Sequence, residues 1–370
     1  MTEHHSDQPK NPHAEHDAPP EFRHEEAMIE LTPLLKHLLA GNTLSPEQTT
    51  WAFEAMMTGK VHHGEIGAML ALLATRTETA AEIVGAAAVM RKHVTRVECD
   101  IDVTEIVDTA GTGGAPKTFN VSTAAAIVAA GAGAIVAKHG NRSRTGRGSA
   151  EVLARLGVNV DADPDVQRRC LERAGVCFCF AIHHHPATKH VMPVRKALGF
   201  PTIFNLLGPL TNPAGARRQL VGVYHDRFVL PIAEALGALG AVRAMVVHSL
   251  DGLDELSISA PTRVVHVQDG SVREEIVEPE RLGLATAPRS AVEARDLEHA
   301  AEMIGGVIEG SEKGPPRDMT LLSAAATLLV ADKVTSMEEG VSRAAEAIDA
   351  GKAKATLEKL IALSRRSSAE

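Results

Sequence analysis

The stretch from Asp108 to Ala150 constrains the fold of this chain more than any other. It reads DTAGTGGAPKTFNVSTAAAIVAAGAGAIVAKHGNRSRTGRGSA and holds two glycine-rich turns, separated by a run of small residues from Thr123 to Ala132. Apolar segments with strand character, 101–108 and 134–137, lead into the turns, and a helix is expected after each turn. Strands that alternate with helices build a mostly parallel sheet whose faces are covered. Both turns then fall at the carboxyl ends of strands, where such sheets bind ligands.

The same stretch is a basic island in an acidic chain. The 370 residues include 47 Asp and Glu against 38 Lys and Arg, which gives a formal charge of -9. No carboxylate lies between Asp108 and Glu151, whereas the basic residues of this interval are Lys117, Lys138, Arg142, Arg144 and Arg147. Glycines let backbone N–H groups crowd around an anion, and a helix N-terminus adds partial positive charge. The island therefore predicts a site for a polyanionic ligand.

Neither turn has the spacing of the common nucleotide-binding loops. The first, GTGGAPKTFNVST, lacks the GxGxxG fingerprint and the Gly-Lys-Ser/Thr ending of a Walker A loop. Glycines followed by hydroxyl and amide side chains at a helix start suit a phosphate or diphosphate, but a tight turn with Ser122 as the helix N-cap is the alternative. In the second turn, Lys138 and Arg142 would supply charge-assisted hydrogen bonds to phosphate, and the alternative is a solvated basic loop.

Composition restricts the class of protein. Apolar residues make up 44% of the chain and aromatic residues only 3%, so the core must consist of Ala, Val, Leu and Ile. The shortage of aromatic side chains and the net acidity argue against nucleic-acid binding. None of the four cysteines forms a CxxC pair, which fits reduced thiols and a cytoplasmic location. We find no signal peptide and no apolar run long enough to span a bilayer.

Patterns along the chain predict three segments. Residues 1–27, rich in His, Pro, Asp and Glu, have no apolar period and are expected to form a disordered tail. Residues 28–97 read as four short helices, with Ser45 and Thr79 as N-caps of the second and the fourth. Helices this short bury little surface alone, so a dimer contact is expected here. Beyond residue 97 the further strands are expected at 177–182, 220–224, 241–247 and 256–267, a hairpin at 271–280, and helices over 291–308 and 318–363.

Two polar clusters lie outside the island. Asp254 and Glu255 stand in the motif DGLDEL, directly after the expected strand 242–248. Adjacent carboxylates repel unless a cation lies between them, and Mg²⁺ accepts one or two carboxylates together with substrate phosphates. The alternative is an acidic turn in water. Three consecutive histidines at 183–185 would point to opposite faces of an extended chain, so we expect a loop near the site rather than a metal site.

Six ordered motifs together carry a family resemblance. They are DTAGTGG…TFNVSTAAA, VAKHGNRS, GSAEVLARLGV, FCFA…HHPA, VRKALGFPTIFNLLGPLTNP and VVHSLDGLDEL. In this order, over roughly Met28 to Leu363, the chain resembles the anthranilate phosphoribosyltransferases of tryptophan biosynthesis. The resemblance implies a small α-helical domain plus a large α/β domain with a central, mostly parallel sheet. The helical domain (28–97) would also receive roughly 191–213, the α/β domain would span 98–370, and a homodimer would form through the helical domains.

The resemblance also implies a reaction and its site. The family joins anthranilate to phosphoribosyl diphosphate, giving N-(5-phosphoribosyl)anthranilate and diphosphate, with Mg²⁺ and with no assigned general acid or base. Phosphoribosyl diphosphate would contact Gly111, Gly114, Ala115, Thr118, Asn120, Val121, Ser122, Thr123, Lys138, His139, Gly140, Asn141, Arg142, Ser143 and Ser149. Mg²⁺ would be held by Ser122, Asp254 and Glu255. Anthranilate would contact Gly111, Asn141 and Arg195, with Arg195 facing its carboxylate and His185 on its entry path.

The chain departs from the family pattern in both turns. Ala115 stands where the family has Asp after GTGG, and each turn is one residue shorter than usual. The second turn also has fewer serines than the family pattern. A carboxylate near the metal is thus missing, and basic residues are added at Lys117, Arg144 and Arg147. We hypothesise that direct Lys and Arg contacts replace part of the metal and hydroxyl contacts, so that activity would depend less on Mg²⁺.

Two alternative functions are weighed against this one. A pyrimidine nucleoside phosphorylase shares the fold and a related glycine turn, but FNLLGPLTNP and DGLDE favour the transferase. A non-catalytic relative would bind a nucleic-acid backbone with the basic island, but the acidic net charge, Arg195 and the Asp254–Glu255 pair argue against it. The expected partners are small-molecule substrates and a second copy of the chain, with no nucleic acid and no membrane.

Overall fold

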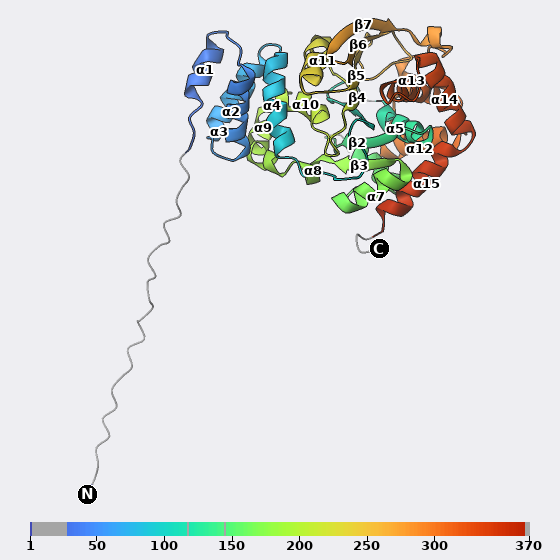
Figure 1. Ribbon diagram of the computed structural model, residues 1–370, viewed down its shortest axis with the longest axis horizontal. Coiled ribbons are helices and arrows are strands. Elements are labelled where there is room, and N and C mark those ends of the chain that lie inside the picture. The colour runs from blue at the N-terminus through green and yellow to red at the C-terminus, as the bar shows by residue number, and fades with distance from the viewer. Residues whose placement is uncertain (2–27, 117, 144–145, 367–370) are drawn as a thin grey trace.

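The protein has two parts that lie side by side, a small bundle of helices and a larger α/β part (Figure 1). The computed structural model describes Met1 and residues 28–116, 118–143 and 146–366. The predicted tail at 1–27 lies outside the described residues except for Met1. The predicted fold class, a helical domain plus an α/β domain with a mostly parallel sheet, is confirmed. Within the described ranges, no helix combines the length and apolar character that crossing a bilayer requires.

The bundle is built from the four short helices that the sequence predicts. They are α1 (Thr32–Leu39), α2 (Pro46–Met57), α3 (His63–Ala74) and α4 (Ala80–Lys92). Both predicted N-caps are confirmed, because the Ser45 and Thr79 side chains accept backbone N–H groups and complete capping boxes. Two helices from much later in the chain, α9 (Met192–Leu198) and α10 (Ile203–Leu207), pack against α3 and α4. The division of the chain at residue 97 stays a prediction.

A seven-stranded sheet forms the centre of the α/β part. Its strands are β1 (Ile106–Gly111), β2 (Ile135–Gly140), β3 (Val176–Phe180), β4 (Arg218–Gly222), β5 (Arg243–Ser249), β6 (Thr262–Gln268) and β7 (Ser271–Val277). Their order across the sheet is β3-β2-β1-β4-β5-β6-β7, with parallel pairs up to β5 and antiparallel pairs beyond it. After β1 the chain continues to β2 on one side and later returns to β4 on the other. The carboxyl ends of β1 and β4 therefore border the crevice where such sheets bind ligands.

Helices cover both faces of the sheet (Figure 1). One face belongs to the larger apolar core, with α5 (Val121–Gly131) and α13 (Pro315–Val330). The other face packs against α11 (Val229–Ala238), and its core is continuous with that of the bundle. The remaining α-helices are α6 (Ser149–Arg155), α7 (Pro164–Ala174), α8 (Ala181–His184), α12 (Leu297–Glu309), α14 (Met337–Asp349) and α15 (Lys352–Ser364). Short 3-10 helices are η1 (Pro186–His190), η2 (Gly208–Leu210), η3 (Asp226–Phe228), η4 (Pro279–Leu282) and η5 (Arg289–Val292).

Two strands start later than the sequence pattern predicts. β1 starts at Ile106, because Asp102 Oδ1 accepts both the N–H and the hydroxyl of Thr104 at 2.8 Å and so favours a turn before the strand. Residues 256–261 precede β6 instead of extending it, because Pro261 cannot donate a hydrogen bond to a neighbouring strand. Ile101 of the first segment and Leu256 and Ile258 of the second pack in or against the core without belonging to the sheet, whereas Val103 is exposed.

Three further details differ from the sequence-based expectations. β2 continues to Gly140, so Lys138 and His139 belong to a strand paired with β3 rather than to the turn. The alternative of Ser122 as a helix N-cap is excluded, because α5 starts at Val121 and Asn120 occupies the cap position without a side-chain cap bond. The histidines at 183–185 are not a plain loop, because the first two belong to the short helix α8.

Candidate active site

The first glycine turn lies where β1 and β4 end beside each other. The Thr112 N–H donates to the Gly222 carbonyl at 2.9 Å, and Gly111 is opposite Gly222 in the strand register. A Cβ on Gly111 would lie 2.9 Å from Asp254 Oδ2, and a Cβ on Gly222 would overlap the Asp254 carbonyl oxygen. Glycine at both positions therefore lets the segment after β5 approach the turn. The structure places the Asp254 carboxylate directly against Gly111.

Lys138 and Glu255 are a basic and an acidic side chain beside this turn. Lys138 is only 3% exposed, and its Nζ donates to the Thr109 carbonyl at 2.7 Å and to Ser122 Oγ at 3.2 Å. Burial lowers the pKa of Lys138. Burial and the adjacent Asp254 charge raise the pKa of Glu255 to about 8, although Lys138 and the Ser122 N–H act in the opposite direction. A further cation near the two carboxylates would favour the ionised form of Glu255.

The second turn is joined to the start of α5 by Asn120. This residue has a left-handed backbone with φ of 66°, and its side-chain amide donates to the Arg147 carbonyl at 3.1 Å. The Arg147 N–H in turn donates to Ser143 Oγ at 2.9 Å. Arg142 is exposed, and its guanidinium carbon lies 5.4 Å from the centre of the Phe180 ring. The two turns thus form one connected surface at the sheet edge.

The predicted phosphoribosyl diphosphate residues divide by their exposure. Exposed members are Gly111, Gly114, Asn141 and Arg142. Partly exposed members are Ala115, Asn120, Ser122, Gly140, Ser143 and Ser149. Buried members are Thr118, Val121, Thr123, Lys138 and His139. The buried side chains pack under the turns and are not open to solvent. Direct contacts with a substrate would therefore come from the exposed and partly exposed residues.

A pair of buried histidines links the end of β2 to the segment after α8. His139 Nδ1 lies 3.1 Å from the Gly208 carbonyl, and its Nε2 lies 3.2 Å from Nε2 of His185. Burial lowers the pKa of His139 well below its usual value and that of His185 to about 4. Both rings are therefore neutral near pH 7, and the geometry fits His185 donating to His139, which donates to Gly208.

Arg195 lies on α9, the helix that packs against the bundle. Its guanidinium carbon is 5.0 Å from the centre of the Phe204 ring on α10, in a cation–π arrangement. The predicted anthranilate residues therefore come from both parts of the molecule, with Gly111 and Asn141 on the sheet edge and Arg195 beside the bundle.

Two residues of this region were not singled out from the sequence. Asp108 is fully buried in β1, where its carboxylate accepts the His139 N–H at 3.0 Å, and burial raises its pKa to about 6. Tyr224 donates its backbone N–H to Thr112 Oγ1 at 2.9 Å, and its side chain lies 3.6 Å from a Cβ placed on Gly114. The available signals were a lone carboxylate inside an apolar run and the only tyrosine of the chain.

Comparisons with known proteins identify the family. The glycosyl transferase family a/b domain matches residues 103–354, and the helical bundle domain of the same family matches residues 32–94. An anthranilate phosphoribosyltransferase from Rubrobacter xylanophilus is 47% identical over 338 residues, which cover 91% of this chain and 98% of the relative. One from Caulobacter vibrioides is 49% identical over 331 residues, with 89% and 96% covered. The chain belongs to the anthranilate phosphoribosyltransferase family.

Solved structures of this phosphoribosyltransferase family share the fold. The enzyme from Thermus thermophilus has a TM-score of 0.84 and 40% identity, with 90% of this chain and 99% of that chain covered. The enzyme from Saccharomyces cerevisiae, in complex with PRPP (phosphoribosyl diphosphate) and Mg, has a TM-score of 0.82 and 27% identity, with 91% and 99% covered.

The departures from the phosphoribosyltransferase pattern fall at the edge of this site. Ala115 is partly exposed beside the first turn and offers no carboxylate. The Arg147 guanidinium donates one hydrogen bond to the Ala294 carbonyl, and its contact with the diphosphate stays a prediction. Lys117 and Arg144, the other two basic residues of that hypothesis, lie outside the described residues.

The donor set fits Mg²⁺ bound together with a substrate. Among the residues described, no group of three or more His, Cys, Asp and Glu side chains is arranged to hold a metal. The adjacent Asp254 and Glu255 carboxylates supply oxygen donors. Ser122 lies next to Glu255, because its N–H acts on that carboxylate and its Oγ accepts a hydrogen bond from Lys138, which also acts on Glu255. Mg²⁺ commonly takes one or two carboxylates, waters and phosphate oxygens, so a phosphorylated substrate would complete its shell.

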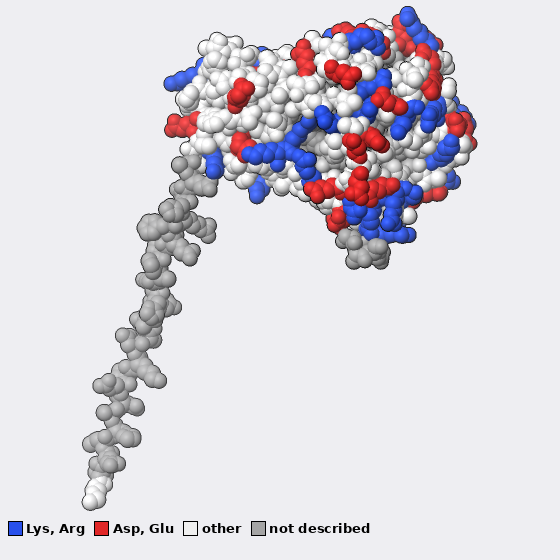
Figure 2. All heavy atoms as spheres, in the orientation of Figure 1, with Lys and Arg blue, Asp and Glu red and all other residues white. Residues whose placement is uncertain are grey.

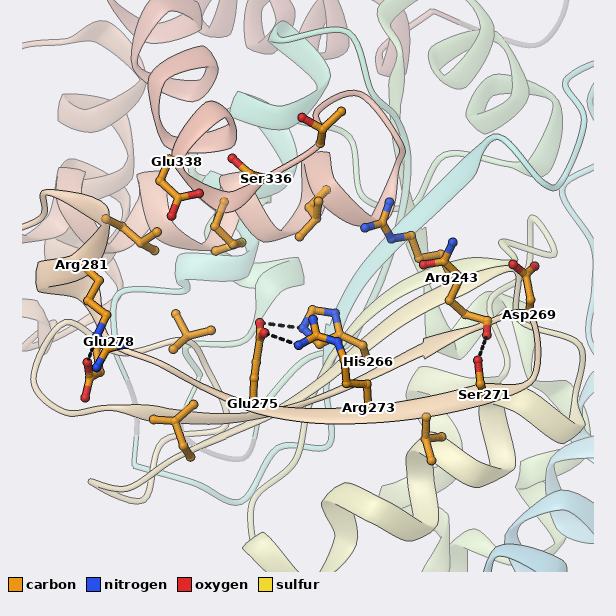
Figure 3. Close-up of a pocket in the computed structure, with 18 residues that line it drawn as sticks. Arg243, His266, Asp269, Ser271, Arg273, Glu275, Glu278, Arg281, Ser336 and Glu338 are labelled. Atoms are coloured by element: carbon orange, nitrogen blue, oxygen red, sulfur yellow. Dashed lines mark hydrogen bonds and ion pairs between the residues drawn. The ribbon is translucent and has the colours of Figure 1, made fainter.

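A separate cavity lies away from these turns, at the other edge of the sheet. Its volume is about 570 Å³, and β6, β7 and the start of α14 form its walls. Figure 3 shows that Glu275 is paired with both His266 and Arg273 on its floor, at 2.7 Å each, and Arg281 with Glu278 at its side. These charges already satisfy one another, so the candidate site is the sheet edge at β1 and β4.

Proposed function

We propose that this chain transfers the 5-phosphoribosyl group from phosphoribosyl diphosphate to the amine of anthranilate. The products are N-(5-phosphoribosyl)anthranilate and diphosphate, which makes this the second step of tryptophan biosynthesis from chorismate. The observation that carries the proposal is the meeting of the first glycine turn, Lys138 and the Asp254–Glu255 pair at the ends of β1 and β4. Relatives with nearly half of their residues identical carry the same activity in their names.

The diphosphate end of the substrate would lie over the two glycine turns. Backbone N–H groups of the first turn, the start of α5 and the Lys138 ammonium all favour negative charge there. The contacting residues proposed are those of the implied set, from Gly111 to Thr123 and from Lys138 to Ser149. Their exposed and partly exposed members supply the direct contacts.

Mg²⁺ is proposed as the metal, held by Ser122, Asp254 and Glu255. A structure of the yeast relative contains PRPP and Mg. When bound, the ion neutralises negative charge on the departing diphosphate. The chain's own contribution is the placement of the Asp254 carboxylate against Gly111, with Glu255 next to it in the chain, which the small size of Gly111 and Gly222 permits.

The reaction needs positioning more than acid or base chemistry. The bond from the ribosyl carbon to diphosphate breaks, the bond to the amine nitrogen forms, and the amine loses a proton to solvent. Basic groups around the turns stabilise the leaving diphosphate while the ribosyl carbon passes through an oxocarbenium-like state. Arg195 would hold the anthranilate carboxylate, with Gly111 and Asn141 beside the ring. The neutral His139–His185 pair would line the entry path without attracting a second anion.

The decisive experiment follows the loss of anthranilate fluorescence when phosphoribosyl diphosphate is added, with and without Mg²⁺. Loss of fluorescence and release of diphosphate in equal amounts would support the transferase. Phosphorolysis of thymidine or uridine in the absence of that reaction would support the phosphorylase instead. A gel shift with DNA and no turnover would support the nucleic-acid binder.

A homodimer through the bundle and a cytoplasmic location are proposed as well. On the face shown in Figure 2, charged side chains gather over the α/β part and few lie on the bundle. Leu39 and Trp51 of the bundle are 70% and 48% exposed, although both are large and apolar. Light scattering should therefore give about twice the mass of one chain, and a monomer at micromolar concentration would refute the dimer.

The reduced Mg²⁺ dependence also stays a proposal. It rests on the absence of a carboxylate at Ala115 and on the added basic residues Lys117, Arg144 and Arg147. Titration of Mg²⁺ with a chelator should leave measurable activity at metal levels that silence the Thermus enzyme. Loss of activity at the same level in both enzymes would refute it.

A further inference from the structure

Glu78 of the bundle faces the loop that follows β4 in the α/β part. It is 3% exposed, and its Oε2 is buried with no hydrogen-bond partner among the described residues. The charged groups that act on it are Arg76 and Glu82 of the bundle and Arg227 of the α/β part, and Tyr224 is close enough to sense its charge. A buried carboxylate oxygen without a partner destabilises the fold, so its presence needs a functional explanation.

Glu82 shows how the same part of the bundle treats a carboxylate that is fully satisfied. Its oxygens accept two backbone N–H groups at 2.9 Å and two Arg76 hydrogen bonds at 2.5 and 3.0 Å. Although burial opposes ionisation, these bonds lower the pKa of Glu82, whereas burial raises the pKa of Glu78 to about 7. Arg76 is committed to Glu82. Arg227 is therefore the cation left to pair with Glu78.

Arg227 has room to move toward the bundle. It is exposed, and its guanidinium carbon lies 4.8 Å from the centre of the Phe228 ring. A cavity of about 360 Å³ lies between this loop and the end of α3, with Phe200 and Pro201 in its wall. The cavity leaves space for the two parts of the molecule to approach each other.

The loop that carries Arg227 also supports the first glycine turn. Tyr224 bonds to Thr112 Oγ1 through its N–H, and its side chain packs beside Gly114. Tyr224 and Arg227 belong to the same short loop, and the Arg227 charge acts on the Tyr224 hydroxyl, opposing the burial that raises its pKa. A displacement of Arg227 would therefore also displace Tyr224 and the turn that would hold the diphosphate.

We propose that Glu78 is a positioning residue for phosphoribosyl diphosphate. When the bundle and the α/β part close on this substrate, the Glu78 carboxylate receives the Arg227 guanidinium and fixes the Tyr224 loop under the first glycine turn. The proposal rests on the proposed function, because it assigns a role in binding that substrate. Glu78 touches neither substrate and acts only through Arg227 and Tyr224.

The test is a double-mutant cycle with Glu78→Gln, Arg227→Gln and the combined variant, with Arg281→Gln as an exposed control. Each single variant should raise the KM for phosphoribosyl diphosphate about tenfold, with a smaller change in the KM for anthranilate. The combined variant should have a KM for phosphoribosyl diphosphate no higher than that of the more impaired single variant, because both changes remove the same pair. The advantage of the wild type over Glu78→Gln should shrink from pH 8 to pH 6, because protonated Glu78 cannot pair with Arg227.

Two results would overturn the proposal while the wild type is active. These are an unchanged KM in Glu78→Gln, or additive losses in the combined variant. If Glu78→Gln does not fold, as judged by its thermal unfolding, the proposal is tested by comparing Arg227→Lys with Arg227→Gln. Arg227→Lys should keep most of the affinity that Arg227→Gln loses, and equal losses would refute the pair. An inactive wild type would instead refute the proposed function.

Discussion

The ammonium group of Lys138 is stable in a buried strand only because acceptors and opposite charges surround it. The Thr109 carbonyl and Ser122 Oγ accept its hydrogen bonds, and Asp108 and Glu255 act against the lowering of its pKa by burial. The same side chain holds Ser122 near Glu255, so one lysine organises both the phosphate end and the carboxylate end of the site. At the residue scale the site is therefore a network of buried charges that are already oriented before a ligand binds.

Replacing Arg195 should separate the two substrates. Arg195→Ala should raise the KM for anthranilate about tenfold or more and that for phosphoribosyl diphosphate much less, because only anthranilate offers Arg195 a carboxylate. Steady-state kinetics by anthranilate fluorescence would measure both values. Lys196→Ala, at the exposed neighbouring position of the same helix, should change neither. Equal effects of Arg195→Ala on both substrates would contradict its role.

The buried His185 should make the protein less stable in mild acid. Its pKa falls from 6.5 to about 4 in the folded chain, so the unfolded chain binds the proton more tightly. The resulting stability is present above pH 6.5 and is lost as the pH falls toward 4, by up to about 3 kcal/mol. Urea unfolding at pH 7.5 and pH 4.5 should show a smaller loss for His185→Gln than for the wild type. The exposed control His63→Gln should lose as much as the wild type, and an identical loss in all three chains would rule the effect out.

At the scale of elements, the site depends on how closely β1, β4 and the segment after β5 approach one another. Gly111 and Gly222 are opposite each other in the register, and Asp254 lies against both. A side chain at either position would push Asp254 and Glu255 away from the first turn. The glycines are needed here for close packing, and neither has the positive φ that makes glycine necessary in a turn.

The substitution Gly222→Ala should damage both the fold and the metal requirement. Its Cβ would overlap the Asp254 carbonyl, which we expect to cost about 1–3 kcal/mol of unfolding free energy and to raise the Mg²⁺ concentration needed for half activity. Gly237→Ala is the matched control, because its Cβ would meet Val267 at an ordinary 3.6 Å and alanine favours the helix α11. Denaturant unfolding should show Gly237→Ala unchanged or slightly more stable. A neutral Gly222→Ala would mean that the segment after β5 can shift freely.

At the scale of the whole molecule, the bundle and the sheet are one packed unit. A single buried core runs from the helices of the bundle to α11 and one face of the sheet. Arg91 of α4 strengthens this junction, because its guanidinium donates to the carbonyls of Leu210 at 2.7 Å and Leu239 at 3.0 Å. Substrate binding between the two parts must therefore occur without separating this core.

Loss of Arg91 should loosen the junction without affecting the sheet edge directly. Arg91→Met would leave two carbonyls with a missing donor, which we expect to cost roughly 2 kcal/mol or more of unfolding free energy. Guanidinium unfolding followed by circular dichroism and by the fluorescence of Trp51 should give one shared transition in the wild type. Arg281→Met, an exposed arginine with 79% of its side chain accessible, should leave that transition in place. Two separate transitions in the wild type would show that the parts unfold independently.

Local sequence patterns were sufficient to predict most helices and strands and the chemical class of the ligand. The capping boxes at Ser45 and Thr79 and the alternation around the two glycine turns depend on neighbours in the chain, and the structure agrees with them. The six motifs were sufficient for the family, because each holds residue types that only a few sites require. The role of each site residue stays a prediction until the variants are measured.

Only the tertiary structure decided which distant residues meet and which charges are buried. Lys138 and His139 look like turn residues in the sequence, because an isolated charge ends a buried strand unless partners from other elements satisfy it. Those partners, Thr109, Ser122 and Gly208, come from β1, α5 and η2. The placement of Asp254 against Gly111 and the burial of a Glu78 carboxylate oxygen without a partner among the described residues likewise arise from packing between segments far apart in the chain. Local sequence sets backbone preferences, whereas burial, and with it the pKa of each buried group, is set by what the rest of the chain folds around it.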